Sequence, residues 1–260
     1  MSLDHDADLV KQQSLTRDAF LGGRLYVAQP RTGFRAGLDS VLLGAAVRED
    51  ASRLLDLGSG VGTAALVALA DRPALRGTLV EADPAMAALA MENLAANGMD
   101  GRAEVLTLDL TEKGARRLAA GLQSDCYDSV IANPPFFDAA RGSAPAPQRA
   151  GARHMAAAGL ELWVKAAATH AAPEGEVIFI YPAPGLLALL AACAPRFGAL
   201  TVLPLSPRAG TAAHRVLLRG IKGSRAPFQL LATRALHEEA GRGFLPPFEA
   251  LFRGTGRLVW

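Results

Sequence analysis

Cysteine is scarce in this sequence: Cys126 and Cys193 are the only two among 260 residues. They lie far apart and lack the short spacing of a metal-binding pair, which argues against a zinc site and against a disulfide framework. So few thiols are typical of a protein from a reducing compartment. We therefore expect no metal in this protein.

Long apolar runs are also missing, although half of the residues are hydrophobic. No uninterrupted apolar stretch reaches the roughly 18–20 residues that a membrane-spanning helix requires. The first eight residues are polar and acidic, unlike a secretory signal peptide. The sequence therefore predicts a cytoplasmic protein without a membrane partner, and its length allows one substantial core.

Positive charge is unevenly distributed along the chain. Residues 1–140 carry 13 Lys and Arg against 19 Asp and Glu, a net charge of −6, whereas residues 141–260 carry 14 against 6, a net charge of +8. Most of the excess is arginine, which favours phosphate recognition. A GC-rich genome also raises arginine content, so a nucleic-acid partner and base composition both remain as explanations.

The most informative stretch runs from Arg53 to Gly62 and reads Arg-Leu-Leu-Asp-Leu-Gly-Ser-Gly-Val-Gly. An apolar run typical of a buried parallel strand is followed by alternate glycines and then by an apolar helix pattern from Thr63. Such a turn places backbone amides and a helix N-terminus beside a ligand. The alternative is a tight strand-to-helix turn with no ligand.

The glycine spacing narrows the choice of ligand. A dinucleotide turn has the form G-x-G-x-x-G and needs a third glycine at position 63, where Thr63 stands. The form found is G-x-G-x-G, preceded by Asp56, and a carboxylate suits a positively charged ligand better than a pyrophosphate. This pattern resembles motif I of the Rossmann-like, S-adenosylmethionine-dependent methyltransferases.

Strand and helix patterns alternate from residue 53 onward, as a doubly wound α/β fold requires. We expect a class I methyltransferase fold with a seven-stranded, mostly parallel sheet and helices on both faces. The parallel strands are expected at 54–57, 78–81, 103–108, 127–132 and 176–181. A final antiparallel hairpin is expected from 200–205 and 215–219, with helices that include 84–97, 110–122 and 159–171.

Three parts of the chain are expected to differ in character. Residues 1–17 are predicted to be a flexible lead-in, and residues 53–260 the methyltransferase domain. Between them, Gly22 and Gly23 predict a small β-hairpin, and Asp39 is a credible cap for a helix over residues 40–47. This middle part, 18–52, is expected to cover the cofactor site, with Arg35 and Asp39 as candidate cofactor contacts or as mere loop and cap residues.

Acidic residues stand at the ends of the second and third expected strands. Glu81 follows Gly58 by 23 residues and can accept hydrogen bonds from both hydroxyls of a ribose. Asp109 can accept from an adenine amine, or it can cap the helix that follows it. The carboxyl ends of parallel strands line the ligand crevice, so both are expected near the glycine turn.

The fourth expected strand leads into Asn133-Pro-Pro-Phe136. The prolines fix φ and have no N–H, so the neighbouring carbonyls and the asparagine side chain are held in place. This run resembles motif IV of methyltransferases that act on an amino nitrogen attached to an sp² carbon.

A wider resemblance covers the chain from about residue 18. It is similar to the bacterial tRNA (adenine-N6)-methyltransferases, which modify an adenine next to the anticodon of a valine tRNA. Besides the two motifs, the resemblance includes Asp18–Gly23, Gln29-Pro30, Gly33–Asp39, Leu42-Leu43, Pro147-Gln-Arg149 and His214–Leu218. Phe136 stands where many members have tyrosine, which keeps ring stacking and removes a hydroxyl contact.

The resemblance implies S-adenosylmethionine as cofactor, S-adenosylhomocysteine as product and RNA, most often tRNA, as partner. The implied cofactor residues are Asp56, Gly58, Ser59, Gly60, Gly62, Glu81, Ala82, Asp109, Leu110, Asn133, Arg35 and Asp39. The implied catalytic residues are Asn133, Pro134, Pro135 and Phe136. Asn133 Oδ1 and the Pro134 carbonyl are expected to accept the N–H bonds of the target amine, and Phe136 to stack on the base.

Basic residues in the second half of the chain are the candidates for holding RNA. They are Arg141, Arg149, Arg153, His154, Arg208, His214, Arg215 and Lys222. Several lie in the loop-like stretch 138–152, which reads as a lid that orders on binding or as a disordered loop with incidental arginines. The sequence leaves the oligomeric state open between monomer and homodimer.

Other functions remain as alternatives. Guanine N2 in ribosomal RNA and protein glutamine are planar amino acceptors too, but glutamine methyltransferases usually carry a helical domain ahead of motif I. A small-molecule O-methyltransferase would need a metal cluster or a catalytic base instead of Asn-Pro-Pro-Phe. A non-enzymatic RNA-binding or cofactor-sensing module would predict lost motif residues, and none is lost.

Overall fold

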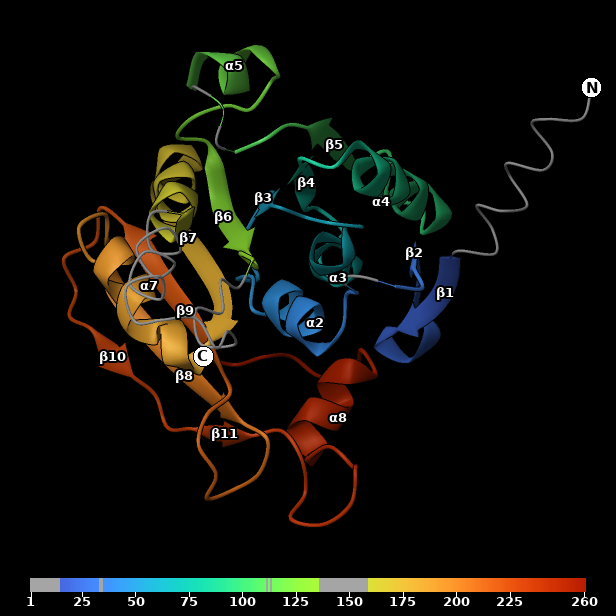
Figure 1. Cartoon of the computed structure of the whole chain (residues 1–260), viewed down its shortest axis with the longest axis vertical. Coiled ribbons are helices and arrows are strands. Elements are labelled where there is room, and N and C mark those ends of the chain that lie inside the picture. The colour runs from blue at the N-terminus through green and yellow to red at the C-terminus, as the bar shows by residue number, and fades with distance from the viewer. Residues whose placement is uncertain (1–14, 33–34, 111, 113, 136–158) are drawn as a thin grey trace, which may run out of the picture.

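The computed structural model describes residues 15–32, 35–110, 112, 114–135 and 159–260. Its centre is a sheet built mainly from seven strands (Figure 1). They are β3 (Arg53–Leu57), β4 (Arg76–Glu81), β5 (Ala103–Thr107), β6 (Tyr127–Ala132), β7 (Ala171–Pro182), β8 (Phe197–Ser206) and β9 (Arg215–Lys222). Two short strands, β10 (Gln229–Leu230) and β11 (Arg234–Ala235), extend it along β8.

The strand order is β10-β8-β9-β7-β6-β3-β4-β5, with β11 also on β8. The strands from β3 to β7 run parallel to one another, and β9 is antiparallel to both β7 and β8. This confirms the predicted fold class and the closing antiparallel hairpin. The sheet has nine strands where seven were expected, because the segment after β9 returns to the free edge of β8 in two pieces.

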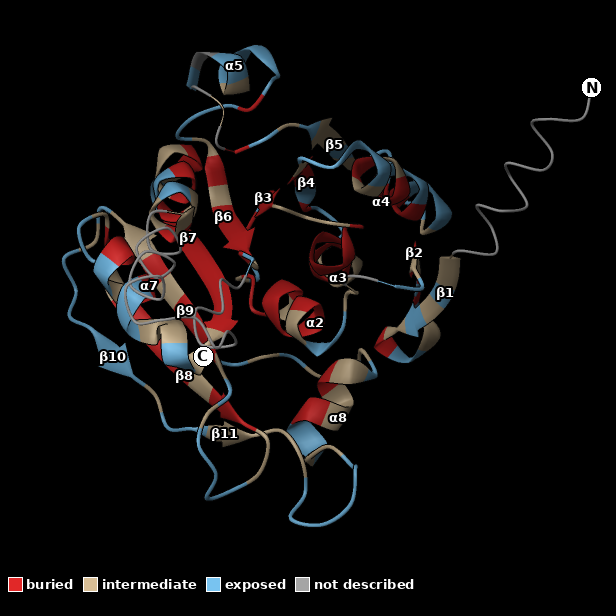
Figure 2. Cartoon of the chain, viewed as in Figure 1, coloured by how far each residue is buried: buried red, intermediate tan, exposed pale blue. Residues whose placement is uncertain are grey.

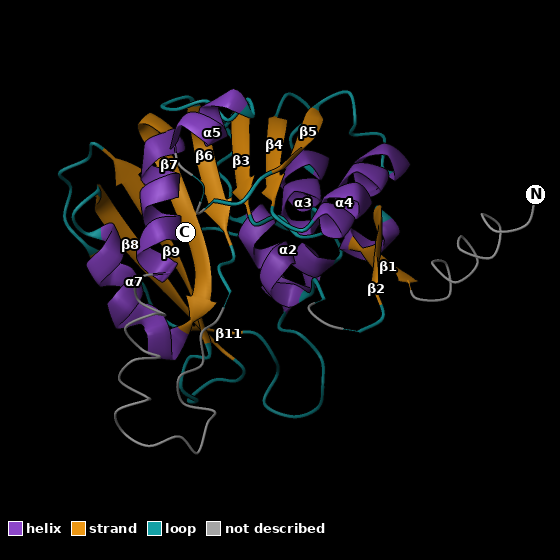
Figure 3. Cartoon of the chain, turned by 45° about the horizontal axis from the view of Figure 1, so that its top comes forward, coloured by secondary structure: helices purple, strands orange, loops and turns teal. Residues whose placement is uncertain are grey.

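Helices cover both faces of the sheet (Figure 3). One face packs on α2 (Leu38–Ala45), α3 (Thr63–Ala70) and α4 (Pro84–Ala96), and the other on a helix over residues 159–170 and on α7 (Leu186–Cys193). The apolar β3 side chains alternate between these two cores: Leu54 belongs to the first, and Leu55 and Leu57 to the second. Residues 63–69 of α3 are buried throughout, as Figure 2 shows.

The N-terminal hairpin pairs β1 (Leu15–Phe20) with β2 (Leu25–Pro30) through a short 3-10 turn, η1 (Leu21–Gly23). Asn93 of α4 and Asn97, the C-cap of that helix, hold β2 in place: their side-chain oxygens accept from the backbone amides of Ala28 and Tyr26 at 2.8 and 3.0 Å. The hairpin is therefore part of the packed structure. Residues 15–17 belong to β1, which corrects their assignment to a flexible lead-in.

The C-terminal segment returns to the hairpin. The helix α8 (Pro246–Phe252) contributes Phe248 and Leu251 to the first core. The last residue, Trp260, donates from its indole to the Ala46 carbonyl at 3.0 Å. The end of the chain is thus fixed beside α2.

Several boundaries differ from the sequence prediction, and three elements show why. The helix α2 begins at Leu38 because Gly37 is its N-cap, so Asp39 lies in its first turn and is no cap. The helix α5 covers only Gly114–Ala119, and Gly121 with φ of +92° ends that segment. β7 starts at Ala171, five residues early, because its pairing with β6 continues across an irregularity between Tyr127 and Ser129.

Candidate active site

The strand register brings the predicted site residues into one row. Leu57 at the end of β3 pairs with Val80 on one side and with Ala132 on the other, so the next residues, Gly58, Glu81 and Asn133, are neighbours. On the far side of β4, Glu81 pairs with Thr107, two residues before Asp109. Adjacent strands lie about 4.8 Å apart, so Asp109, Glu81, Gly58 and Asn133 follow one another along the carboxyl edge.

A cavity of about 720 Å³ opens over this row. Its described lining includes the end of the hairpin, the start of α2, the glycine turn, the ends of β4, β5 and β6, and the helix over 159–170. The lining residues are Pro30, Thr32, Ala36, Ser40, Gly58, Ser59, Gly60, Val61, Val80, Glu81, Ala82, Asp83, Met86, Leu108, Asp109, Leu110, Asn133, Pro135, Gly159, Leu162 and Trp163. This is the size of a site for a nucleoside-sized ligand.

Backbone hydrogen bonds hold the glycine turn open toward the cavity. The Ser59 amide donates to the Val80 carbonyl at 3.0 Å, and the Gly62 amide to the Ser59 carbonyl at 2.9 Å. Gly58, Gly60 and Gly62 have φ of +64°, +55° and +86°, values that residues with a Cβ rarely adopt. The Ser59 hydroxyl is buried and has no partner among the described residues.

Glu81 is fixed by the turn that it faces. Its Oε2 accepts from the Gly60 amide at 2.8 Å, and its Oε1 accepts from the Asp83 amide at 2.9 Å. Each carboxylate oxygen has further lone pairs, so the group can accept two hydroxyl donors without moving. This is the arrangement that recognition of a ribose diol requires.

All the charged side chains in the described lining of the cavity are negative. It has three carboxylates, Glu81, Asp83 and Asp109, and no lysine, arginine or histidine. Asp83 also caps α4, accepting from the Ala85 and Met86 amides at 2.8 and 3.3 Å. A site of this charge suits a cation and opposes a pyrophosphate or a triphosphate.

Asn133 brings an unsatisfied hydrogen-bond acceptor to the cavity. Its Oδ1 is buried and has no hydrogen-bond partner among the described residues. Buried polar atoms are almost always paired, and leaving one unpaired costs about 1–3 kcal/mol. Pro134 is buried behind it and Pro135 is exposed at the cavity wall. The acceptor is thus held ready for a donor that the described residues do not supply.

Comparison with known proteins agrees with this geometry. The model of the methyltransferase small domain family matches residues 37–180 of the chain. The chain belongs to this family. The matched region contains the glycine turn, Glu81, Asp109 and Asn133, which are the residues that form the edge of the cavity.

Two curated relatives are tRNA1(Val) (adenine(37)-N6)-methyltransferases. The one from Aeromonas hydrophila is 34% identical over 199 residues, which is 75% of this chain and 80% of the relative. The one from Porphyromonas gingivalis is 32% identical over 170 residues, 64% of this chain and 65% of the relative. The match therefore spans slightly less than two thirds of the length of the Porphyromonas protein.

A solved structure shares most of the fold. The crystal structure of a predicted O-methyltransferase from Agrobacterium tumefaciens superimposes with a TM-score of 0.72 at 29% identity, covering 85% of this chain and 98% of that one. The class I methyltransferase fold that the sequence predicts is therefore confirmed.

Four of the expected cofactor residues do not line the cavity. Asp56 is buried and accepts from the Ala65 amide at 3.2 Å. Gly62 packs on Leu79, and Arg35 pairs with Asp18 at 2.5 Å. Asp39 pairs with the Arg215 guanidinium at 2.8 Å. These residues shape the walls and support the turn from behind.

The expected substrate residues divide into three groups. Phe136, Arg141, Arg149, Arg153 and His154 lie outside the described residues. His214 and Arg215 stand at the start of β9, where Arg215 meets Asp39 next to the cavity residue Ser40.

Lys222 and Arg208 form the third group, which is engaged within the fold. Lys222 donates to the carbonyls of Ala168 and Ala171, at the amino end of β7 and away from Asn133. Arg208 donates to the Glu238 and Gly241 carbonyls at 3.2 and 2.8 Å.

Trp163 is the wall residue that sequence reasoning missed. It lies on the helix over residues 159–170, which is the first described element after motif IV. An added Cβ on Gly58 would lie 2.3 Å from its Cη2 atom, so the indole lies directly against the glycine. In a single sequence, a tryptophan on an apolar helix reads as core, and only the fold shows its contact with the turn.

A matched pair of glycines tests this contact. Both Gly58 and Gly60 have positive φ, but a Cβ on Gly60 meets nothing within 4 Å. Gly60→Ala is expected to cost about 1–2 kcal/mol from the backbone alone. Gly58→Ala should cost clearly more, because the new methyl also displaces Trp163. Urea denaturation measures the loss in free energy of unfolding for each variant. Equal losses for Gly58→Ala and Gly60→Ala would contradict the contact. So would an additional loss for Gly58→Ala that persists when Trp163 is also replaced by alanine.

Asp56 gives the folded protein a pH dependence. Burial raises the pKa of Asp56 from 3.8 to about 8; the Ala65 hydrogen bond opposes this rise and the Glu81 charge adds to it. Between about pH 4 and 8, the folded state keeps a proton that the unfolded state has released, so the free energy of unfolding falls as pH rises and levels off above about 8.

Asp56→Asn removes this titration and keeps an acceptor for the Ala65 amide. The variant should gain stability relative to the wild type as pH rises from 5 to 8, by at most roughly 1.4 kcal/mol for each pH unit. Chemical denaturation of both proteins at pH 5, 6.5 and 8 measures the difference. A difference that stays constant with pH would mean that Asp56 ionises normally in the folded protein.

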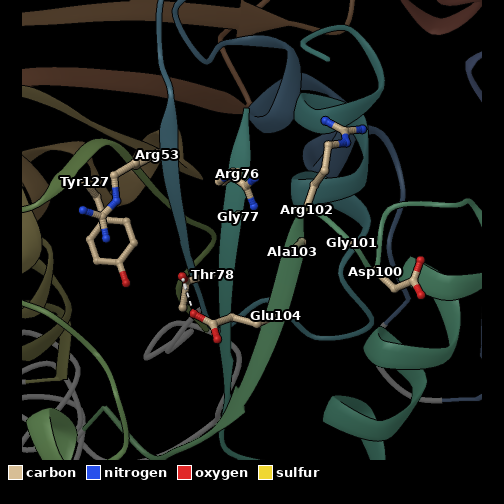
Figure 4. A pocket seen from close by; sticks show the side chains of 10 residues that line it. All are labelled: Arg53, Arg76, Gly77, Thr78, Asp100, Gly101, Arg102, Ala103, Glu104 and Tyr127. Atoms are coloured by element: carbon tan, nitrogen blue, oxygen red, sulfur yellow. Dashed lines mark hydrogen bonds between the residues drawn. The ribbon is translucent and has the colours of Figure 1, made fainter. Parts of the chain in front are cut away.

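A second hollow, of about 350 Å³, lies at the amino ends of β3, β4 and β5 (Figure 4). Its polar side chains are used within the fold. Arg102 donates to the carbonyls of Arg72, Pro73 and Leu75 at 3.0–3.2 Å, and Thr78 donates to Glu104 at 3.2 Å. The hollow lies at the strand ends opposite to those that carry Gly58 and Asn133, so it is separate from the candidate site.

Two kinds of feature are absent from the part of the chain that the structure describes. None of its helices is long and apolar enough to cross a membrane. In the same ranges, no three histidine, cysteine, aspartate or glutamate side chains gather where they could hold a metal ion.

Proposed function

We propose that this methyltransferase binds S-adenosylmethionine at the carboxyl edge of its sheet and methylates the N6 amine of an adenine in tRNA. The unpaired, buried Oδ1 of Asn133 carries the proposal. Of the common acceptor groups, a planar amine offers N–H bonds to such an oxygen, and the exocyclic amine of adenine is one.

The described residues fit the cofactor. Glu81 offers both carboxylate oxygens toward a ribose, Asp109 and Leu110 line the neighbouring part of the cavity, and the glycine turn follows. Ser59 adds a buried hydroxyl without a described partner. The cofactor supplies an activated methyl group on a sulfonium cation, and the negative lining of the cavity favours that charge.

The protein contributes position and hydrogen bonding. The amino lone pair of adenine is conjugated with the ring, which makes the amine a weak nucleophile. Asn133 Oδ1 and the Pro134 carbonyl each accept one N–H, which localises the lone pair on nitrogen. When bound, the cofactor would supply its methyl group to this nitrogen and leave as the neutral thioether, and the methylated nitrogen would lose a proton to water. Such positioning accounts for most of the rate enhancement.

The tRNA target is supported by the relatives and by charge. The proteins from A. hydrophila and P. gingivalis carry names that specify adenine 37 of tRNA1(Val). Residues 141–260 carry the net charge of +8 that a phosphate backbone attracts. An adenine in a structured loop must be turned out of its stack to reach Asn133. A cytoplasmic location follows from such a substrate.

An O-methyl acceptor is the second candidate, because the Agrobacterium structure is described as a predicted O-methyltransferase. A hydroxyl acceptor needs a base to remove its proton. The described lining near Asn133 consists of Pro135, Gly159, Leu162 and Trp163, which offer no base. The site therefore favours a nitrogen atom over an oxygen atom as the acceptor of the methyl group.

The test is mass spectrometry of nucleosides from total tRNA of a strain that lacks this gene. We expect N6-methyladenosine to be lost and to be restored by the wild-type gene but not by Asn133→Ala. An unchanged tRNA profile would overturn the tRNA target, and analysis of guanine N2 in ribosomal RNA and then of protein glutamines would follow.

A further inference from the structure

The row of residues along the sheet edge limits where the sulfonium charge can lie. This inference rests on the proposed function, because it assumes S-adenosylmethionine as the ligand. A ribose at Glu81 and an acceptor at Asn133 leave the position between them for the sulfonium, and the strand register puts Gly58 there. The charge of the cofactor therefore falls next to Gly58.

Among the described residues, Glu81 is the lining carboxylate that neighbours Gly58 in the register, and it already accepts from the Gly60 and Asp83 amides. The lining carboxylates, Glu81, Asp83 and Asp109, stand at or after the ends of β4 and β5, on the ribose and adenine side. On the acceptor side, the lining is Asn133, Pro135, Gly159, Leu162 and Trp163. A cation at this point needs a neutral group that attracts positive charge.

Trp163 is such a group. It is the one aromatic residue in the described lining of the cavity, and its ring atoms Cη2 and Cζ3 would lie 2.3 and 2.9 Å from a Cβ on Gly58. The helix that carries Trp163 is packed into the second core by three of its apolar residues, Leu160, Val164 and Ala167. The indole is thus held rigidly at the position that the register assigns to the sulfonium.

We propose that Trp163 recognises the sulfonium of S-adenosylmethionine through a cation–π interaction, and that it thereby distinguishes the cofactor from its neutral product. A positive charge within about 6 Å of an indole ring is attracted to its face, more strongly where water is excluded. S-adenosylhomocysteine carries a neutral thioether and gains nothing from this contact. Trp163 therefore favours binding of S-adenosylmethionine and promotes release of S-adenosylhomocysteine.

Isothermal titration calorimetry of the full chain tests this selectivity, with three ligands. S-adenosylmethionine and sinefungin, which has a charged amine near the sulfonium position, are the cationic probes, and S-adenosylhomocysteine is the neutral one. In Trp163→Leu, the ratio of the Kd of S-adenosylhomocysteine to the Kd of S-adenosylmethionine should fall by about 5–30-fold. Sinefungin should follow S-adenosylmethionine.

Two variants separate charge recognition from packing. Trp163→Phe keeps an aromatic face and should retain part of the selectivity. Leu162→Ala removes an apolar wall residue of the same helix, 45% exposed, and should leave the ratio unchanged. Thermal denaturation checks that every variant is folded. If Trp163→Leu does not fold, the test rests on the ratio of the two Kd values measured for Trp163→Phe.

The outcomes are distinguishable. Equal weakening of all three ligands in the folded Trp163 variants would overturn the cation–π role and leave the tryptophan as a packing residue. Failure of the wild type to bind either S-adenosylmethionine or S-adenosylhomocysteine would instead overturn the proposed function itself.

Discussion

Asn133→Ala is expected to lower the rate of methyl transfer to RNA by about 10²–10³-fold, the usual effect of removing one oriented hydrogen-bonding group from an active site. In the proposed mechanism, the buried Oδ1 is the acceptor that localises the lone pair of the target amine. Single-turnover kinetics with undermodified tRNA and labelled cofactor measures the loss. Cofactor affinity, measured by calorimetry, should change much less than the rate.

The same variant has an unusual expected effect on stability. Removing a buried polar side chain normally destabilises a protein, but Asn133 Oδ1 has no described partner to lose. The melting temperature of the ligand-free variant should be unchanged or slightly raised. Asn133→Asp keeps an acceptor oxygen and should retain more activity than Asn133→Ala. Full activity in Asn133→Ala would rule out the assigned role.

Glu81→Ala is expected to weaken S-adenosylmethionine binding by about 100-fold, because a charged hydrogen bond contributes roughly 1.5–3 kcal/mol and the ribose offers two donors. The variant also releases the Gly60 and Asp83 amides, which Glu81 holds at 2.8 and 2.9 Å. Calorimetric titration gives the affinity directly.

Asp83→Ala is the matched control for Glu81→Ala. Asp83 lines the same cavity with the same charge, but its carboxylate caps α4. Loss of the cap should cost about 1 kcal/mol of stability and much less cofactor affinity than the loss of Glu81. Equal affinity losses in the two variants would indicate a general charge effect in place of ribose recognition.

Local sequence patterns were sufficient to predict which residues meet at the carboxyl edge of the sheet. A buried strand, a glycine turn and a helix are encoded within about fifteen residues, and the parallel sheet then aligns the strand ends that carry Glu81, Asp109 and Asn133. The family named from these motifs is confirmed by the match over residues 37–180. The oligomeric state and the partition into domains stay predictions.

Contacts between distant segments could not be predicted in this way. The assignment of Asp39 as a helix cap was wrong because its partner, Arg215, lies 176 positions away. Asp56 was expected to face the ligand, but strand alternation turns it to the α3 side, where the Ala65 amide binds it. Trp163 contacts Gly58 only because the helix over residues 159–170 packs on the face of the sheet that carries Leu55 and Leu57 of β3.

The most direct test of the central claim is a crystal structure of the protein with S-adenosylmethionine. We predict the adenine beside Asp109, the ribose hydroxyls on Glu81, the sulfonium beside both Gly58 and Trp163, and the methyl group directed toward Asn133 Oδ1. A cofactor bound elsewhere, or bound in this cavity with its methyl group directed away from Asn133, would contradict the assignment of the site.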